Sequence, residues 1–302
     1  MAALAATLFA WLGPLSRWAY ERGMEPVGFV AWRAGIGALA LAVLLVLARR
    51  RMPALRSVPA RQRAALGVAT VMALCLNLFV FAAFERTSVA LVLIGFYTYP
   101  AMVALVAILL GRDRLSRGVL AALGVAMGGM LLVVAGSLDA AAVLRLDALG
   151  LALALGAAAS QTVFVTISRD GYPSVPTEMA IVVVLGGSAL GCLGLGLATG
   201  LGRDLALPAA QPGALLPLVA VAGILVAAVP SVLFLTAIRR VGGTRAGIVM
   251  LLEPVVGVAL AAVLLGEALR PVQLLGALAV LGAAVLLQLT AGRRPEVGSR
   301  TA

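Results

Sequence analysis

The charged side chains that fall inside long apolar stretches are the residues of this sequence best suited to chemistry. Glu253 lies midway along the apolar stretch 246–265, and Arg33 lies near the start of the stretch 27–48. A charge at membrane depth is costly unless it is paired or faces water, so both are functional candidates. Glu253 could exchange protons or bind a substrate amine. Alternatively, hydrogen bonds simply hold its carboxyl beside the proline that follows it.

Arg33 is a candidate for binding a carboxylate, because a guanidinium grips that group through two parallel hydrogen bonds. Arg17 lies at the other side of the same short loop and could contribute. The alternative is that both side chains extend to the membrane surface or pair with an acid, namely Glu21, Glu25 or Glu85.

Three prolines lie within apolar stretches and predict kinks that could act in gating: Pro100, Pro230 and Pro254. Proline removes a helical hydrogen bond and bends the helix. At Pro100 and Pro254 the carbonyls left free would be those of Phe96 and Met250. Kinks also occur in membrane helices that do not gate, so the spacing alone leaves the role open.

Uncharged polar and aromatic residues at mid-depth could line a binding cavity: Trp11, Asn77, Tyr97, Tyr99, Ser160, Gln161 and Ser231. Small-molecule sites are commonly apolar with a few polar groups, as this set would be. Each aromatic taken alone is equally explained by packing or by a place at the membrane interface. Tyr99 precedes Pro100 as Glu253 precedes Pro254, so the two side chains could face each other.

Composition indicates which elements must position these residues. Of 302 residues, 63% are apolar and 12% are charged, and the mean hydropathy is +1.13. A soluble domain of this length cannot bury so much apolar surface, whereas about 20 apolar residues cross a bilayer as a helix. We therefore predict an all-α integral membrane protein with ten transmembrane helices. They lie near 2–20, 27–48, 64–84, 88–110, 118–135, 148–167, 179–198, 214–238, 246–265 and 272–290.

The net charge of +11 comes from arginine alone, since the sequence contains no lysine. Most arginines lie in the segments 49–63, 111–117, 239–245 and 292–302, which all fall on one side of the membrane. The bias predicts that this side is cytoplasmic, that both termini lie there, and that the protein resides in the inner (plasma) membrane. The basic segment 49–63 could also contact anionic lipids. The expected partners are membrane lipids and a small molecule, and not nucleic acid.

Residues 87–132 and 244–287 form an internal repeat. Each begins with threonine, carries a residue–proline pair in mid-helix and leaves the helix at glycine: Thr87, Tyr99-Pro100 and Gly111, then Thr244, Glu253-Pro254 and Gly266. The copies are five predicted helices apart, and an odd offset turns the second copy upside down. Inverted repeats around a mid-membrane site are typical of secondary transporters.

The domain organisation follows from this repeat. We predict a first five-helix repeat at 1–136, a second and inverted one at 148–291, and a cytoplasmic tail at 292–302.

These blocks resemble the EamA-type permeases of the drug/metabolite transporter superfamily, over essentially the whole chain. The matching residues are Arg33, the block from Thr87 through Tyr99-Pro100 to Gly111, and the block from Glu253-Pro254 to Gly266-Glu267-Ala268-Leu269. Gly111-Arg112-Asp113 departs from the Gly-Glu that is usual there. The resemblance implies export of metabolites, amino acids or toxic compounds, and it supplies no substrate.

We therefore expect a secondary transporter that works by alternating access, with proton coupling through Glu253 as one option. Two other classes stay open. A structural or regulatory membrane subunit would need neither inverted repeats nor a mid-membrane glutamate. An intramembrane enzyme could use Ser188 within Gly186-Gly187-Ser188-Ala189, but the chain has no histidine to serve as its base.

No cofactor or metal is expected, because the sequence lacks a phosphate-binding Gly-Lys loop and histidine ligands. Pairs of glycines four residues apart permit close helix packing and could also support a homodimer. They are Gly124/Gly128, Gly187/Gly191 and Gly196/Gly200.

Overall fold

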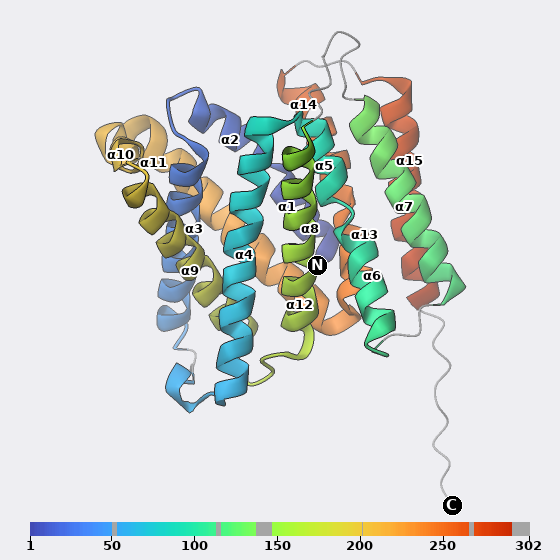
Figure 1. Cartoon of the computed structure of the whole chain (residues 1–302), viewed down its shortest axis with the longest axis horizontal. Helices are drawn as coiled ribbons and strands as arrows, with labels where there is room; N and C mark the ends of the chain where they lie inside the picture. Colours follow the sequence, from blue (N-terminus) through green and yellow to red (C-terminus); the bar gives the residue numbers. More distant parts are fainter. Residues whose placement is uncertain (50–52, 113–115, 137–146, 201, 266–268, 292–302) are drawn as a thin grey trace, which may run out of the picture.

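The computed structural model describes residues 1–49, 53–112, 116–136, 147–200, 202–265 and 269–291, and these residues are almost entirely helical (Figure 1). No strand occurs within these ranges. The expected tail 292–302, and the repeat-end residues 113–115 and 266–268, lie outside the described residues.

Eight helical segments in the described part of the chain are long and apolar enough to cross a membrane. Five are single helices: α3 (Pro26–Leu47), α4 (Ala60–Arg86), α7 (Arg117–Gly136), α8 (Ala148–Asp170) and α9 (Thr177–Ala198). Three combine consecutive helices: α5 (Val89–Phe96) with α6 (Tyr99–Leu109); α11 (Pro212–Val221) with the π-helix η2 (Ala222–Ala228) and α12 (Val229–Val241); and α13 (Gly243–Met250) with α14 (Leu252–Leu265). All eight coincide with spans predicted from the sequence.

The two ends of the chain differ from these eight segments. The stretch 2–20 consists of two short helices, α1 (Ala2–Ala10) and α2 (Leu12–Tyr20), and the last helix is α15 (Pro271–Ala291). The expectation of one uninterrupted helix over 2–20 is wrong, because Pro14 has no amide hydrogen to offer the carbonyl of Ala10. Two further short helices were not expected, η1 (Leu55–Ser57) and α10 (Gly202–Ala210).

The outward faces of the helices carry large apolar side chains. Leu47 is 75% exposed, Leu109 is 74% exposed and Val263 is 82% exposed. Apolar surface on this scale is unfavourable in water but matches the interior of a bilayer, and helices satisfy their own backbone groups there. The chain is therefore a multi-pass membrane protein.

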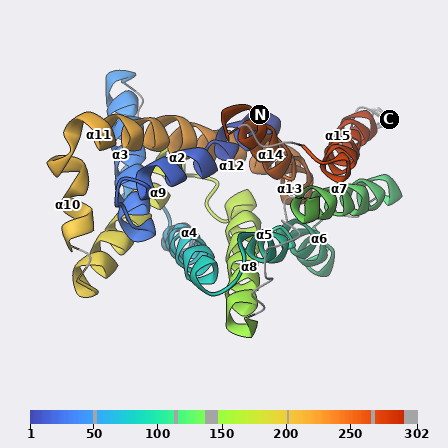
Figure 2. The ribbon, with the colours of Figure 1, turned by 90° about the horizontal axis from the view of Figure 1, so that it is seen from above.

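Helices from the two halves of the chain pack against one another, and Figure 2 shows them intermixed when the molecule is seen from above. α3 packs against α9 and η2, α4 packs against α8 and α9, and α7 packs against α15. α1 packs against α12 and α14, and α6 packs against α13. Each of these pairs joins a helix of residues 1–136 to a helix of residues 148–291, so the two halves share one core.

Glycines allow the closest of these contacts. A Cβ atom added to Gly129 of α7 would lie 2.7 Å from the carbonyl oxygen of Gly276 on α15. A Cβ added to Gly37 of α3 would lie 2.6 Å from the carbonyl oxygen of Gly223 on η2. Small residues let helix backbones approach closely in membranes, where packing rather than water drives association.

The α7–α15 contact generates a prediction with an adjacent control. Gly129→Val should lower the melting temperature of the protein in detergent, because overpacking costs about 1–3 kcal/mol and here the obstacle is backbone. Gly128→Val should leave the melting temperature unchanged, since a Cβ at Gly128 meets no described atom within 4 Å. Equal melting temperatures for both variants would contradict the close approach.

Candidate functional site

Three helices are interrupted at the residue that lies three positions before a proline. The breaks fall at Trp11, Tyr97 and Leu251, ahead of Pro14, Pro100 and Pro254. All three residues have ψ close to zero, at −12°, 9° and −6°. Proline cannot donate to the carbonyl four residues earlier, and its ring crowds that turn, so the helix restarts at a new angle.

Pro230 is a different case, because no break precedes it. The backbone instead widens into the π-helix η2, which ends directly before α12. A π-turn inside a membrane helix leaves a local defect in the regular hydrogen-bond ladder, and such defects are frequent at functional sites.

The second and third breaks lie next to each other in space and bring a polar pair together. Tyr97, at the break between α5 and α6, and Glu253, at the start of α14, lie close enough for the hydroxyl and the carboxyl to interact. Tyr99 lies close enough to Glu253 to interact with its charge. Tyr97 is 3% exposed and Tyr99 is 2% exposed, whereas Glu253 is half-buried. The sequence predicted that Tyr99 could face Glu253, and Tyr97 also interacts with this carboxyl.

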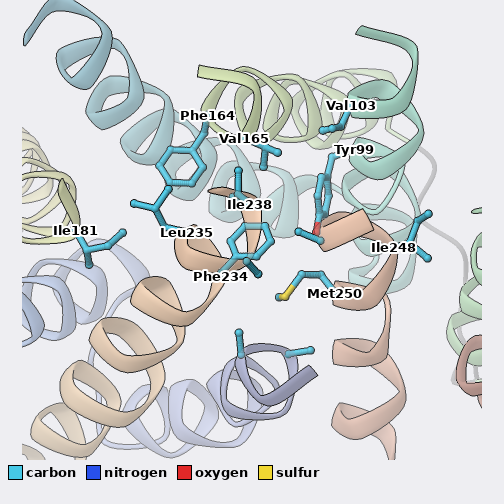
Figure 3. Close-up of a cluster of buried hydrophobic side chains, with 14 of the residues drawn as sticks. Tyr99, Val103, Phe164, Val165, Ile181, Phe234, Leu235, Ile238, Ile248 and Met250 are labelled. Atoms are coloured by element: carbon cyan, nitrogen blue, oxygen red, sulfur yellow. The ribbon is translucent and has the colours of Figure 1, made fainter. Parts of the chain in front are cut away.

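Tyr99 packs against the second half of the chain. Its ring points from α6 toward the α13 ribbon, and Ile248 and Met250 lie nearby (Figure 3). A Cβ atom added to Gly247 of α13 would lie 3.5 Å from Cε2 of Tyr99 and 3.3 Å from Cβ of Pro100. Gly247 therefore lies in close contact with Tyr99 and Pro100, with little free space between them. The rings of Phe96 and Tyr99 are 5.4 Å apart, which fixes the aromatic side chains against each other.

The other predicted site residues differ in what their side chains contact. Trp11 lies at the first helix break, and Ser160 donates to the carbonyl of Gly156 at 2.9 Å. Gln161 and Ser231 are half-buried, and their side chains form no hydrogen bond within the described part of the chain. Gln161 and Ser231 therefore have bonding capacity left for a ligand.

Arg33 and Asn77 form a second polar pair that the sequence did not predict. Nη2 of Arg33 donates to Oδ1 of Asn77 at 2.7 Å, and Arg33 is only 8% exposed. The hypothesis that Arg33 extends to the membrane surface or pairs with Glu21, Glu25 or Glu85 is wrong for this residue, since α3 directs it into the bundle. For Arg17 it is correct, because its Nε lies 3.3 Å from a carboxylate oxygen of Glu21.

Sequence reasoning missed a cluster around Arg239, which it had counted only as one of the arginines that set the orientation. The guanidinium at the end of α12 donates to the carbonyl of Val175 at 2.9 Å and to the hydroxyl of Thr177 at 3.1 Å. It also reaches the carbonyl oxygen of Tyr172 at 3.4 Å and lies 5.1 Å from the centre of that ring. These contacts tie α12 to the connection between α8 and α9, and no local sequence signal could have paired residues so far apart.

Neighbouring contacts strengthen the same end of the bundle, at the bottom of Figure 1. The Tyr172 hydroxyl donates to Ser168 at 2.5 Å, and burial raises the pKa of this phenol against the opposing effects of Ser168 and Arg239, so it stays protonated. Gln62 at the start of α4 exchanges two hydrogen bonds with Ser174, at 3.1 and 3.0 Å. We refer to Gln62, Ser168, Tyr172, Ser174 and Arg239 as the Arg239 clamp.

An apolar groove of about 560 Å³ lies between the first helices and the α11–η2 segment. Its walls are Leu8, Trp11, Leu15 and Trp18 on one side and Ala214, Pro217, Leu218, Val221, Leu225 and Val226 on the other. Small-molecule sites in proteins commonly have such volumes and mostly apolar walls. Of the predicted site residues, Trp11 contributes to this groove.

Together these features define the class of the molecule: a multi-pass α-helical membrane protein whose two halves meet at interrupted helices around buried polar pairs. A family model, the EamA-like transporter family, matches residues 1–135 and 148–289. The chain belongs to this family, within the drug/metabolite transporter superfamily. Membership of this family identifies the protein as a membrane transporter of small molecules, in agreement with the resemblance seen in the sequence.

The fold is also seen in a solved structure. A crystal structure of another protein matches with a TM-score of 0.75 over 96% of both chains, at 18% sequence identity. At that identity the similarity concerns the fold alone. No curated protein sequence gives a significant match.

The Arg239 clamp predicts a stability difference between two adjacent arginines. Arg239→Gln should destabilise the protein by about 2 kcal/mol, because hydrogen bonds to a charged donor are lost and buried carbonyls are left without a partner. Arg240→Gln should have no measurable effect, since Arg240 is exposed. Thermal melting of both variants in detergent makes the comparison, and an unchanged Arg239→Gln variant would show that the clamp contributes nothing.

Proposed function

We propose that the protein is a secondary transporter that exports small amphipathic metabolites by alternating access between two inverted five-helix repeats. The observation that carries this proposal is the pair Tyr97–Glu253, in which a hydroxyl from the first half of the chain lies next to a carboxyl from the second half, each at a helix break that precedes a proline. A carboxyl shared in this way is a natural point at which proton binding could alter how the halves meet.

The pattern of helix packing supports the two repeats. We number ten spans, with α1–α2 as the first and α15 as the tenth, so that α3 and α9 are equivalent, as are α7 and α15. Exchanging each span for its equivalent in the other half turns the α4–α8 contact into α12–α1 and the α3–η2 contact into α9–α4. Both of the resulting contacts are present. Contacts that come in such exchanged pairs are what a twofold relation between the halves requires.

The arginine distribution supports the orientation. The α8–α9 connection and the start of α4 lie at the same end of the bundle as the basic loops, which places the Arg239 clamp on the cytoplasmic side. Under this assignment both termini are cytoplasmic in the plasma membrane. The cycle must then break the clamp to admit a substrate from the cytoplasm.

The site would combine an apolar environment with a few polar contacts. Tyr97, Tyr99 and Glu253 form its centre, and Gln161 and Ser231 offer unused hydrogen-bonding groups. The breaks before Pro100 and Pro254, and the π-turn before Pro230, are the flexible points of the gates. No step of this cycle needs a cofactor, and the protein is proposed to have no enzymatic activity.

Glu253→Gln tests the coupling role. In proteoliposomes, efflux by the wild-type protein should vary with pH, whereas the variant should transport with a flat pH profile, because the amide keeps the shape and cannot exchange a proton. Glu85→Gln, which changes an exposed glutamate at the end of α4, should retain the wild-type profile. A Glu253→Gln profile that follows the wild type would remove Glu253 from coupling.

A further inference from the structure

Arg33 is a buried cation whose hydrogen-bonding capacity is incompletely used. Its side chain is 8% exposed, and one contact to a side-chain oxygen is formed, from Nη2 to Asn77. Nε is buried and has no hydrogen-bond partner, and the nearest ring, Phe29, lies 6.0 Å from the guanidinium carbon. No acidic side chain pairs with Arg33 within the described residues.

Arg239 shows what a purely structural arginine looks like in the same chain. Its donors reach backbone oxygens of Ser168, Tyr172 and Val175 and the hydroxyl of Thr177, and it packs on the Tyr172 ring. The protein itself supplies hydrogen-bond acceptors to that guanidinium and a ring that packs on it. Arg33 has one amide oxygen instead of four oxygens, although it is the more deeply buried of the two.

Asn77 holds the guanidinium in place without neutralising it. The Nδ2 group of Asn77 donates to the carbonyl of Ala73 at 2.8 Å, which orients Oδ1 toward Arg33. The other close neighbours, Tyr20 and Cys192, are uncharged side chains in an apolar setting. An unneutralised charge inside a protein costs several kcal/mol, and an anion that arrives from outside would recover that cost.

We propose that Arg33, positioned by Asn77, binds the carboxylate of a small organic acid with an apolar body. The proposal rests on the proposed transport function and specifies the chemical class of the substrate. A carboxylate suits the site because its two oxygens match the parallel N–H groups of a guanidinium. The apolar body suits it because Cys192 belongs to a cluster with Leu74 and Leu78 beside the pair.

The test uses purified full-length protein in detergent and three probes, hexanoate, benzoate and phenylacetate, each compared with its primary amide and with chloride. At least one carboxylate should raise the melting temperature at millimolar concentration, while its amide and chloride should not. Arg33→Gln should weaken that binding by about tenfold or more. Arg22→Gln should bind as the wild type does, because Arg22 is exposed and donates to the carbonyl of Trp18.

Asn77→Asp provides a second variant in case Arg33→Gln does not fold. An aspartate there would supply the missing negative charge next to Arg33. The variant should therefore melt at a higher temperature than the wild type and lose the shift caused by carboxylates. If Arg33 had a purely structural role, Asn77→Asp would still melt at a higher temperature, but carboxylates would continue to raise its melting temperature.

Three results would overturn the proposal: no shift with any carboxylate, an equal shift with amides or chloride, or a shift that Arg33→Gln leaves intact. Flux of the probes in proteoliposomes separates this proposal from the transport function. Carboxylate binding that depends on Arg33 without any flux would support the site and refute transport. Flux of carboxylates that Arg33→Gln leaves unchanged would support transport and refute the site.

Discussion

A polar group inside a membrane must find its partner within the protein, and this constraint shapes the whole structure. The backbone meets it by forming helices, so the described chain is helical almost throughout. Side chains meet it through a small number of pairs: Tyr97 with Glu253, Arg33 with Asn77, and Arg239 with the α8–α9 connection. Each pair links different helices, so the arrangement of helices and the pairing of polar groups depend on each other.

These pairs differ in how completely they are satisfied, and the difference suggests a division of roles. The Arg239 clamp is saturated with backbone oxygens and closes one end of the bundle. The Tyr97–Glu253 pair lies at two helix breaks, where backbone geometry is already irregular. Arg33 retains an unpaired donor. The proposed transport cycle would need a seal at one end that can open and a centre with unused bonding capacity, and these pairs are our candidates for the two roles.

Much of the fold was predictable from the sequence, because the length of an apolar run and the position of a proline act locally. Eight spans were placed correctly, and the breaks ahead of Pro100 and Pro254 follow from the missing amide hydrogen. The break at Trp11 was missed although Pro14 carries the same signal. Arg33–Asn77 and the Arg239 clamp could not be foreseen, since their partners lie 44 and 64 residues apart and meet only in the packed bundle.

The central claim is that the mid-membrane polar residues border a passage that water can enter, and side-specific cysteine labelling tests it most directly. In a protein with Cys75 and Cys192 replaced by alanine, Gln161→Cys is compared with Val163→Cys, a partly exposed apolar position on the same helix. The account predicts that a membrane-impermeant thiol reagent modifies Gln161→Cys from both sides of the membrane and spares Val163→Cys. If the reagent failed to label Gln161→Cys from one side or from both sides, the result would contradict the account.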